Sequence, residues 1–384
     1  MKRICSILIL LLALTACNAP SPSLLTSDEP TPSPYPDTPS PPRIDAPLIE
    51  SPALVKIHFV NQLDGWGVTE TGTVRTNDGG ITWYDVTPSE LTEAGYAVDW
   101  FVLDNSQVWI QQPDFANFPN GGFQFHTTDG GISWNKYAVP FSGAKLSFLD
   151  SNHGWALADL GVGAGSNAVA VYQTNDGGAT WNLKYINDPN HPSAGDTLPL
   201  GGLKHGLTPI DMKTAWVYGV VYAPGTTYIF RTDDAGSTWV PVNLSLPQGY
   251  EDGEFSIEQL QFVSAIDAYL IVRATADQVN TAVYVSSDAG STWSLTPTLI
   301  PGGAVAEFLQ TGEVILYNRE QFYVTHDAAR TWSIIPPDVR FNDTFAAMDF
   351  LTAFTGYVLT LDPANHRSLY RTDDGGGTWF PVVP

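Results

Sequence analysis

The chain has little cysteine and little positive charge. Of its 384 residues only Cys5 and Cys17 are cysteines, so from residue 18 onward there is no thiol for a disulfide, a zinc-thiolate site or a cysteine nucleophile. Lys and Arg total 17 against 40 Asp and Glu, a formal net charge of −23. Such a field repels nucleic acid and anionic lipid headgroups, which excludes both as expected partners. The 7 His residues include no close pair, so no metal site and no cofactor are predicted.

The N-terminus carries the one long apolar run. MKRICSILILLLALTAC begins with two cations, continues with Leu, Ile and Ala over too short a stretch for an ordinary membrane-spanning helix, and ends Leu14-Thr15-Ala16-Cys17. The last four residues resemble the lipobox of bacterial lipoproteins. That resemblance implies a signal peptide at 1–16, cleavage before Cys17 and lipid on Cys17; an uncleaved or ordinarily cleaved signal is the alternative. An extracytoplasmic protein, lipid-anchored to the bacterial cell membrane on its periplasmic or cell-surface side, is expected.

Residues 17–52 are rich in Pro, Ser and Thr with almost no apolar content. Such a stretch cannot bury enough surface to offset its ordering entropy, so we predict a disordered, extended tether. Residues 53–384 then form one domain. Within the tether, Ile44–Glu50 is the candidate segment for a strand that joins the first and last parts of that domain.

One eight-residue phrase, S/T-x-D-x-G-x-S/T-W, recurs seven times, and its Asp residues are 51, 47, 58, 54, 39 and 47 residues apart. This spacing is typical of the four-stranded blades of a β-propeller. The copies are Thr76–Trp83, Thr127–Trp134, Thr174–Trp181, Thr232–Trp239, Ser286–Trp293, Thr325–Trp332 and Thr372–Trp379.

The phrase has the chemistry of a tight turn that opens onto a strand. The Asp carboxylate accepts hydrogen bonds from nearby backbone N–H groups, and the fifth residue supplies positive φ. That residue is Gly in six copies and Ala329 in the other, where we expect a strained or reshaped corner. The Trp offers a large apolar surface to the space between blades, with an N–H that needs one partner. The structural residues are Asp78, Asp129, Asp176, Asp234, Asp288, Asp327 and Asp374 with Trp83, Trp134, Trp181, Trp239, Trp293, Trp332 and Trp379.

Alternating segments such as KIHFV, GWGVT, TVRT and TWYDV divide each repeat into four strands. The predicted fold is therefore all-β, a seven-bladed β-propeller of four-stranded antiparallel blades, each with one of these turns. The repeats resemble the Asp-box, or BNR, family over about residues 53–384. VRTNDGGITW, FRTDDAGSTW and YRTDDGGGTW are most similar to the photosystem II stability and assembly factor type of propeller.

That resemblance implies a non-enzymatic, membrane-anchored scaffold that binds a protein client, and we expect a monomer. Sialidases share the turn, so a carbohydrate-binding or glycosidase protein of the cell surface, with a glycan as partner, is the alternative. Sialidase chemistry needs three converging Arg residues. Arg75, Arg231 and Arg371 precede the first, fourth and seventh turns, which places them too far apart in a ring. The favoured interpretation is that they stack on Trp or pair with Asp233 or Asp373; contact with a client is the functional one.

Long connections are the remaining candidates for recognition. Segments 111–123, 161–168, 187–206 and 243–259 exceed turn length and contain Phe115, Phe118 and Tyr250, which either grip a peptide or sugar or pack inward. Calcium is not expected in the turns, because TNDGGITW lacks the alternating Asp ligands and distal Glu of a calcium loop.

Overall fold

The computed structural model describes residues 46–309 and 311–383, all of which belong to one compact unit, Pro41–Pro384. The predicted signal peptide, Cys17 and most of the predicted tether lie outside the described residues. Apart from strands, the described ranges contain two short 3-10 helices, η1 (Gly95–Ala97) and η2 (Asn342–Thr344). No helix in the described ranges has both the length and the apolar character needed to cross a membrane.

Five of the sheets in the described ranges contain one antiparallel run of four consecutive strands each, in chain order. The β2–β5 blade has β2 (Leu54–Phe59), β3 (Gly65–Thr69), β4 (Thr73–Thr76) and β5 (Trp83–Asp85); the β6–β9 blade has β6 (Asp99–Val102), β7 (Val108–Pro113), β8 (Gly122–Thr127) and β9 (Asn135–Val139); the β10–β13 blade has β10 (Gly143–Phe148), β11 (Gly154–Gly163), β12 (Ser166–Thr174) and β13 (Asn182–Ile186). The β23–β26 blade has β23 (Val305–Phe308), β24 (Val314–Tyr317), β25 (Phe322–Thr325) and β26 (Ser333–Ile335), and the β27–β30 blade has β27 (Phe345–Phe350), β28 (Gly356–Leu361), β29 (Arg367–Thr372) and β30 (Phe380–Pro381).

A sixth sheet has nine strands and consists of two such runs in succession. Strand pairing between the two runs is limited to a single register pair, Val220 with Ser256. We call the runs the β14–β17 half and the β18–β21 half. Their strands are β14 (Leu203–Pro209), β15 (Ala215–Val220), β16 (Tyr228–Thr232) and β17 (Val240–Pro241), then β18 (Glu254–Phe262), β19 (Ala268–Thr275), β20 (Val279–Ser286) and β21 (Ser294–Leu295), with β22 (Ile300–Pro301) added to β20.

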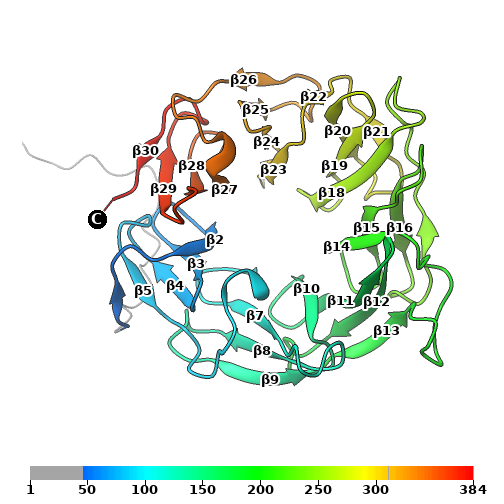
Figure 1. Cartoon of the computed structure of the whole chain (residues 1–384), viewed down its shortest axis with the longest axis horizontal. Coiled ribbons are helices and arrows are strands. Elements are labelled where there is room, and N and C mark those ends of the chain that lie inside the picture. The colour runs from blue at the N-terminus through cyan, green and yellow to red at the C-terminus, as the bar shows by residue number, and fades with distance from the viewer. Residues whose placement is uncertain (1–45, 310, 384) are drawn as a thin grey trace, which may run out of the picture. The chain divides into compact units, whose positions relative to one another are not determined.

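Figure 1 shows these units standing side by side around a ring, with the first strand of each unit toward the centre and the fourth strand outside. The prediction of an all-β propeller of four-stranded antiparallel blades is confirmed. All four predicted loops are shorter than the segments given for them, because strands occupy their ends. Segment 111–123 overlaps β7 and β8, segment 161–168 is largely a hairpin between β11 and β12, and segments 187–206 and 243–259 end within β14 and β18.

Hydrophobic side chains are buried between neighbouring units, each cluster drawing on two of them. Every Trp of the repeated phrase joins one of these clusters, at a different interface in each case. The expectation that each indole N–H finds a partner is only partly met. Trp83 and Trp379 donate to carbonyls of their own turns, and Trp134 and Trp181 donate to the preceding blade, whereas Trp239, Trp293 and Trp332 have no partner among the described residues.

The repeated phrase forms the turn between the third and fourth strands of every unit, and its hydrogen bonds are the same in all copies. In the first, Thr76 Oγ1 donates to Asp78 Oδ1 at 2.9 Å and accepts the N–H of Gly80 at 2.9 Å. Asp78 then accepts the backbone N–H of Thr82 at 2.8 Å and its hydroxyl at 2.5 Å. In the fifth copy, the hydroxyl and N–H of Thr292 lower the pKa of Asp288 to about 2.

Two successive residues of this turn have positive φ, whereas the sequence pattern predicts one. The fourth residue has φ of +56° to +78° and the fifth +59° to +102°. Alanine occupies the fourth position as Ala235, Ala289 and Ala328 and the fifth as Ala329, at φ +59°. The Ala329 corner is not reshaped, because its N–H still donates to Thr325 Oγ1 at 3.0 Å.

The ring closes by packing between the β27–β30 and β2–β5 blades. The rings of Phe59 and Tyr357 stack with centroids 3.6 Å apart, and the Asp349 carboxylate accepts the N–H of Phe59. The described part of Ile44–Glu50 forms strand pairs with the β2–β5 blade. There β1 (Leu48–Ile49) pairs with β5 on the outside of the blade, and Ile49 packs against the hydrophobic cluster between the two blades.

We predict that Gly131→Ala lowers the free energy of unfolding by about 2–4 kcal/mol, because a Cβ at φ +87° would also lie 2.7 Å from Val86 Cβ on the preceding blade. Gly79→Ala is the matched control. Its φ is similar at +76°, but the nearest atom to its Cβ would be the Gln62 carbonyl oxygen at 3.0 Å and the others lie at 3.5 Å or more, so we expect a loss of about 1–2 kcal/mol. Urea unfolding of the three proteins measures the difference, and equal losses would contradict the packing argument.

Pairing of β1 predicts that the end of the tether contributes to stability. Deleting residues 18–50 removes the backbone hydrogen bond from Asp85 to Pro47 and the contact of Ile49 with the closing cluster. We expect the melting temperature to fall by a few degrees. Deleting only residues 18–43 keeps β1 and should leave the melting temperature unchanged; the same temperature for both deletions would show that β1 adds nothing.

Candidate functional site

The residue just before each turn forms a joint with the following unit. Arg75 is a cross-strand partner of Trp66, and its guanidinium carbon lies 5.4 Å from the centre of that ring. Its Nη1 donates to the carbonyl of Gly130 in the next blade's turn at 3.2 Å, and its Nη2 lies 3.7 Å from Asp64 Oδ1. Burial lowers the pKa of Arg75, and the Asp64 carboxylate opposes that change. This cation is part of the interface between blades.

Arg231 and Arg371 repeat the arrangement with more exposure. Arg231 lies 5.1 Å from the Trp216 ring and donates to Asp233 and, at 3.1 Å, to Ser291 Oγ in the next turn. Arg371 donates to Asp373 at 2.8 Å and lies beside Gly79 in the first turn. Each of the three Arg residues thus points toward a different turn, and the structure does not bring them together.

The same position holds other side chains elsewhere in the ring. Gln173 donates to the carbonyl of Met212 at 2.9 Å in the next unit. His126 stacks on Trp109 with centroids 4.2 Å apart, and its Nε2 has no partner among the described residues. Burial lowers the pKa of His126 to about 4, so the imidazole is neutral at pH 7. Val285 and Val324 occupy the position in the β18–β21 half and the β23–β26 blade.

The predicted aromatic contacts divide into two kinds. Phe115 and Phe118 lie on the loop between β7 and β8 and are exposed by 65% and 46%. Tyr250 is half-buried, packs against the cluster between the β14–β17 and β18–β21 halves, and hydrogen-bonds Asn280. The structure therefore offers Phe115 and Phe118 as one exposed pair and places Tyr250 in a packing role.

A pocket of about 290 Å³ at the inner edge of the ring was missed by the sequence analysis. It gathers Lys56 from β2, Lys145 from β10, and Lys204 with His205 from β14. A signal was present, since the first strands read VKIHFV, AKLSF and LKHGL, each with a lysine. Four basic side chains at one place are unusual in a chain with 17 Lys and Arg against 40 acids.

Two of these lysines are exposed enough to meet a ligand, and the third is structural. Lys204 is 4% exposed and donates to the carbonyls of Asn167, Leu200 and Gly202, and burial lowers its pKa to about 8. Lys145 is exposed and lies 3.0 Å from Asp99. Lys56 is half-buried and donates to the Val98 carbonyl. Asp99 and Asp159 also line the pocket, so its three lysines face two carboxylates and a smaller net positive charge remains.

Acidic side chains gather on the first strands of other blades. Asp349 on β27 is 5% exposed, and Glu307 lies on the neighbouring strand β23. Burial, and then the nearby Asp349 carboxylate, raise the pKa of Glu307 well above its usual range. The pKa of Asp349 is raised as well, mainly by burial, and two neighbouring carboxyl groups with shifted pKa values are the pairing that glycoside hydrolysis uses. In residues 46–309 and 311–383, no three His, Cys, Asp or Glu side chains are grouped so as to hold a metal ion.

Comparison with known proteins gives one curated relative and a set of similar folds. The chain is 27% identical over 154 residues to the photosystem II assembly lipoprotein Ycf48 of Synechococcus sp. (strain CC9902), an alignment that covers 38% of this chain and 43% of the relative. The chain therefore matches less than half the length of that protein. No family model matches.

Solved structures with this fold include proteins of different function. One described as YCF48 bound to D1 peptide aligns with a TM-score of 0.52 and 18% identity, covering 87% of this chain and 97% of that one. The GH74 xyloglucanase of Xanthomonas campestris aligns with a TM-score of 0.59 and 12% identity, covering 88% of this chain and 56% of that one. At these identities the likeness establishes the propeller fold and leaves function open.

The depressed pKa of His126 predicts a pH dependence of stability. Between pH 6.5 and about 4 the unfolded chain binds a proton that the folded chain excludes, so this group costs stability as the pH falls through that window. His126→Gln should therefore show a shallower fall in melting temperature from pH 6.5 to 4 than the unmodified protein. His366→Gln, whose side chain is 79% exposed, is the control; identical slopes for all three proteins would contradict the prediction.

Proposed function

We propose that this chain is a non-enzymatic binding propeller that holds an acidic or carboxylate-ending segment of a protein client at a membrane surface. The observation that carries the proposal is the basic pocket around Lys56 and Lys145 in an otherwise strongly acidic chain. Ammonium groups at a concave site recruit carboxylates by long-range attraction and then pair with them directly. The curated relative is named as an assembly lipoprotein, and one protein with the fold is described as binding a peptide.

We further propose that the ring has seven Asp-box blades, with each half of the nine-stranded sheet counting as one blade. Each half has its own four antiparallel strands and its own repeated turn, and only one register pair links the two halves. A separate hydrophobic cluster lies between them, as it does between the other neighbouring units. The single link joins the last residue of β15, the second strand of one half, to β18, the first strand of the other.

The membrane association in this proposal rests on the sequence. Lipid on Cys17 and a Pro-rich tether beyond it would hold a monomeric propeller outside the cytoplasm, near a membrane-embedded client. The name of the curated relative, an assembly lipoprotein of photosystem II, supports this arrangement and suggests an assembly or stability role. Arg231, Arg371, Phe115 and Phe118 are exposed enough to extend such a contact surface.

A glycosidase or other carbohydrate-binding protein of the cell surface is the second candidate. The observation that favours it is the pair Glu307 and Asp349, since the raised pKa of Glu307 suits a general acid. The pair also has a structural role, because Asp349 accepts the N–H of Phe59 where the ring closes. We therefore rank catalysis below binding.

We predict that a fluorescein-labelled ten-residue peptide of Glu, Ala and Gly with a free C-terminal carboxylate binds the full chain, and that Lys56→Glu with Lys145→Glu weakens binding at least about tenfold. Reversing the charge of both lysines replaces attraction by repulsion, and raising salt from 50 to 200 mM should weaken binding by the unmodified protein. Fluorescence anisotropy measures the affinity, and the amidated peptide reports the contribution of the terminal carboxylate.

Lys184→Glu combined with Lys213→Glu is the control, because it makes the same change in net charge at two exposed lysines that do not line the pocket, and it should bind as the unmodified protein does. Equal affinity of the Lys56 and Lys145 variant and this control would contradict the proposed site. Hydrolysis of a glycoside by the purified protein, abolished by Glu307→Gln, would contradict the non-enzymatic proposal in favour of the second candidate.

A further inference from the structure

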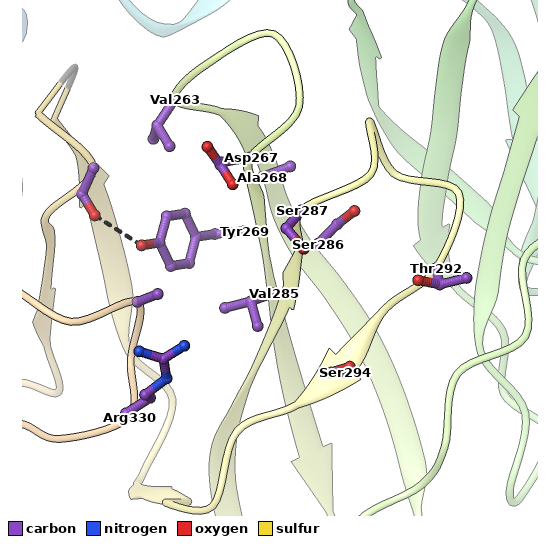
Figure 2. Close-up of a pocket in the computed structure, with 12 residues that line it drawn as sticks. Val263, Asp267, Ala268, Tyr269, Val285, Ser286, Ser287, Thr292, Ser294 and Arg330 are labelled. Carbon is purple, nitrogen blue, oxygen red and sulfur yellow. Dashed lines mark hydrogen bonds between the residues drawn. The ribbon is translucent and has the colours of Figure 1, made fainter.

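A second cavity, of about 410 Å³, lies at the joint between the β18–β21 half and the β23–β26 blade. Figure 2 shows Tyr269 at its centre, Asp267 above that ring, and Val285 and Arg330 below it. Val285 is the residue that precedes the turn, the position that Arg75, Arg231 and Arg371 hold in three other units. The cavity is thus found where those units place a guanidinium.

The Arg75 joint shows what surrounds a guanidinium at this position. Arg75 has three neighbours: the ring of its cross-strand partner Trp66, the carboxylate of Asp64 two residues before that ring, and the carbonyl of Gly130 in the next turn. Aromatic face, carboxylate and carbonyl together recognise a guanidinium through stacking, charge and hydrogen bonding.

The first two of these groups recur around the cavity. Tyr269 is the cross-strand partner of Val285, as Trp66 is of Arg75. Asp267 stands two residues before Tyr269, as Asp64 stands two before Trp66. The carboxylates are also held alike.

In each case one carboxylate oxygen is already engaged within the same short turn. Asp64 Oδ2 accepts from Asn61 at 2.9 Å, and Asp267 Oδ2 accepts from Ser264 at 2.8 Å. The other oxygen of Asp64 faces Arg75, whereas the other oxygen of Asp267 has no hydrogen-bond partner recorded in the described part of the chain. The third group is supplied by Ala328, the fourth residue of the next turn, which lines the cavity as the counterpart of Gly130.

Other joints that lack arginine are built differently. His126 fills its position by stacking on Trp109, and Gln173 donates to the next unit. Val324 pairs across the strands with Ile315, so that joint has no aromatic ring opposite the missing cation. At Val285 the aromatic ring and the carboxylate are kept and the side chain that they would bind is absent.

We propose that this cavity binds the arginine side chain of a peptide or protein partner, with the guanidinium against the face of Tyr269, paired with Asp267 and donating to the Ala328 carbonyl. The site is separate from the basic pocket and draws its ligand by the opposite charge, so it stands independently of the proposed function. Arg330, which lines the cavity from the turn and is exposed, is the intramolecular competitor for Asp267.

Saturation-transfer NMR on the full chain with N-acetyl-arginine amide tests the site, with N-acetyl-citrulline amide as the neutral ligand of the same shape. We expect saturation of the arginine side-chain protons and little of citrulline. Val285→Arg should abolish the signal, because the new side chain fills the cavity as Arg75 fills its own joint. Asp267→Asn should weaken binding at least about fivefold through loss of the charged partner. Asp277→Asn, an exposed carboxylate on the β19–β20 connection, should leave binding unchanged.

Arg330→Ser removes the competitor, so binding should be retained or tighter. Melting temperatures of all variants establish that they fold, and Asp267→Asn keeps the test decisive if Val285→Arg does not. Equal signals from arginine and citrulline, an undiminished arginine signal in Val285→Arg or Asp267→Asn, or loss of binding in Arg330→Ser would each overturn the proposal.

Discussion

The ring depends on one kind of contact, in which the backbone of each repeated turn packs closely against the preceding unit. Two successive residues with positive φ bring the turn close, and at Gly131 the approach leaves no room for a side chain. Such a backbone is unfavourable for most residues, and in three copies alanine adopts it at the fourth position. The Asp carboxylate and the hydroxyls on either side of it stabilise that conformation through the same four hydrogen bonds each time, as around Asp78.

This contact also explains where the units differ. The side chain before each turn lies between two units, and in every described unit but that of Val324 it faces an aromatic residue across the strand. Arg75 is held there by charge and hydrogen bonds, His126 by stacking, and Gln173 by one amide donor. Because the turns hold neighbouring units together, the side chain that precedes each turn can differ between units. A short side chain such as Val285 then leaves a cavity while the two units stay packed.

Much of the fold could be predicted from the sequence because the residues that form each turn are all close together in the chain. The recurring Asp and Trp indicate the propeller, and alternation locates most strands. The positive φ at the fourth residue of the turn could not be predicted from glycine alone, since three copies have alanine there, as Ala235, Ala289 and Ala328. The basic pocket was missed for another reason. Lys56, Lys145 and Lys204 are far apart along the chain, and only the ring brings their first strands together. Ile44–Glu50 was a candidate strand from the sequence, but its pairing with β5 could not be predicted, because a two-residue strand carries no periodicity.

The charge of the chain has two distinct physical origins. The carboxylate of Asp288 in the fifth turn accepts hydrogen bonds from the hydroxyl and N–H of Thr292, which lower its pKa to about 2 and keep it ionised near neutral pH. Glu307 differs, since burial beside Asp349 favours its protonated form. Of these two kinds of carboxyl, the Glu307 and Asp349 pair is the one whose pKa values are raised. Asp349, however, also accepts the N–H of Phe59, which ties the pair to closure of the ring and supports the proposal that the basic pocket, and not this pair, binds another molecule.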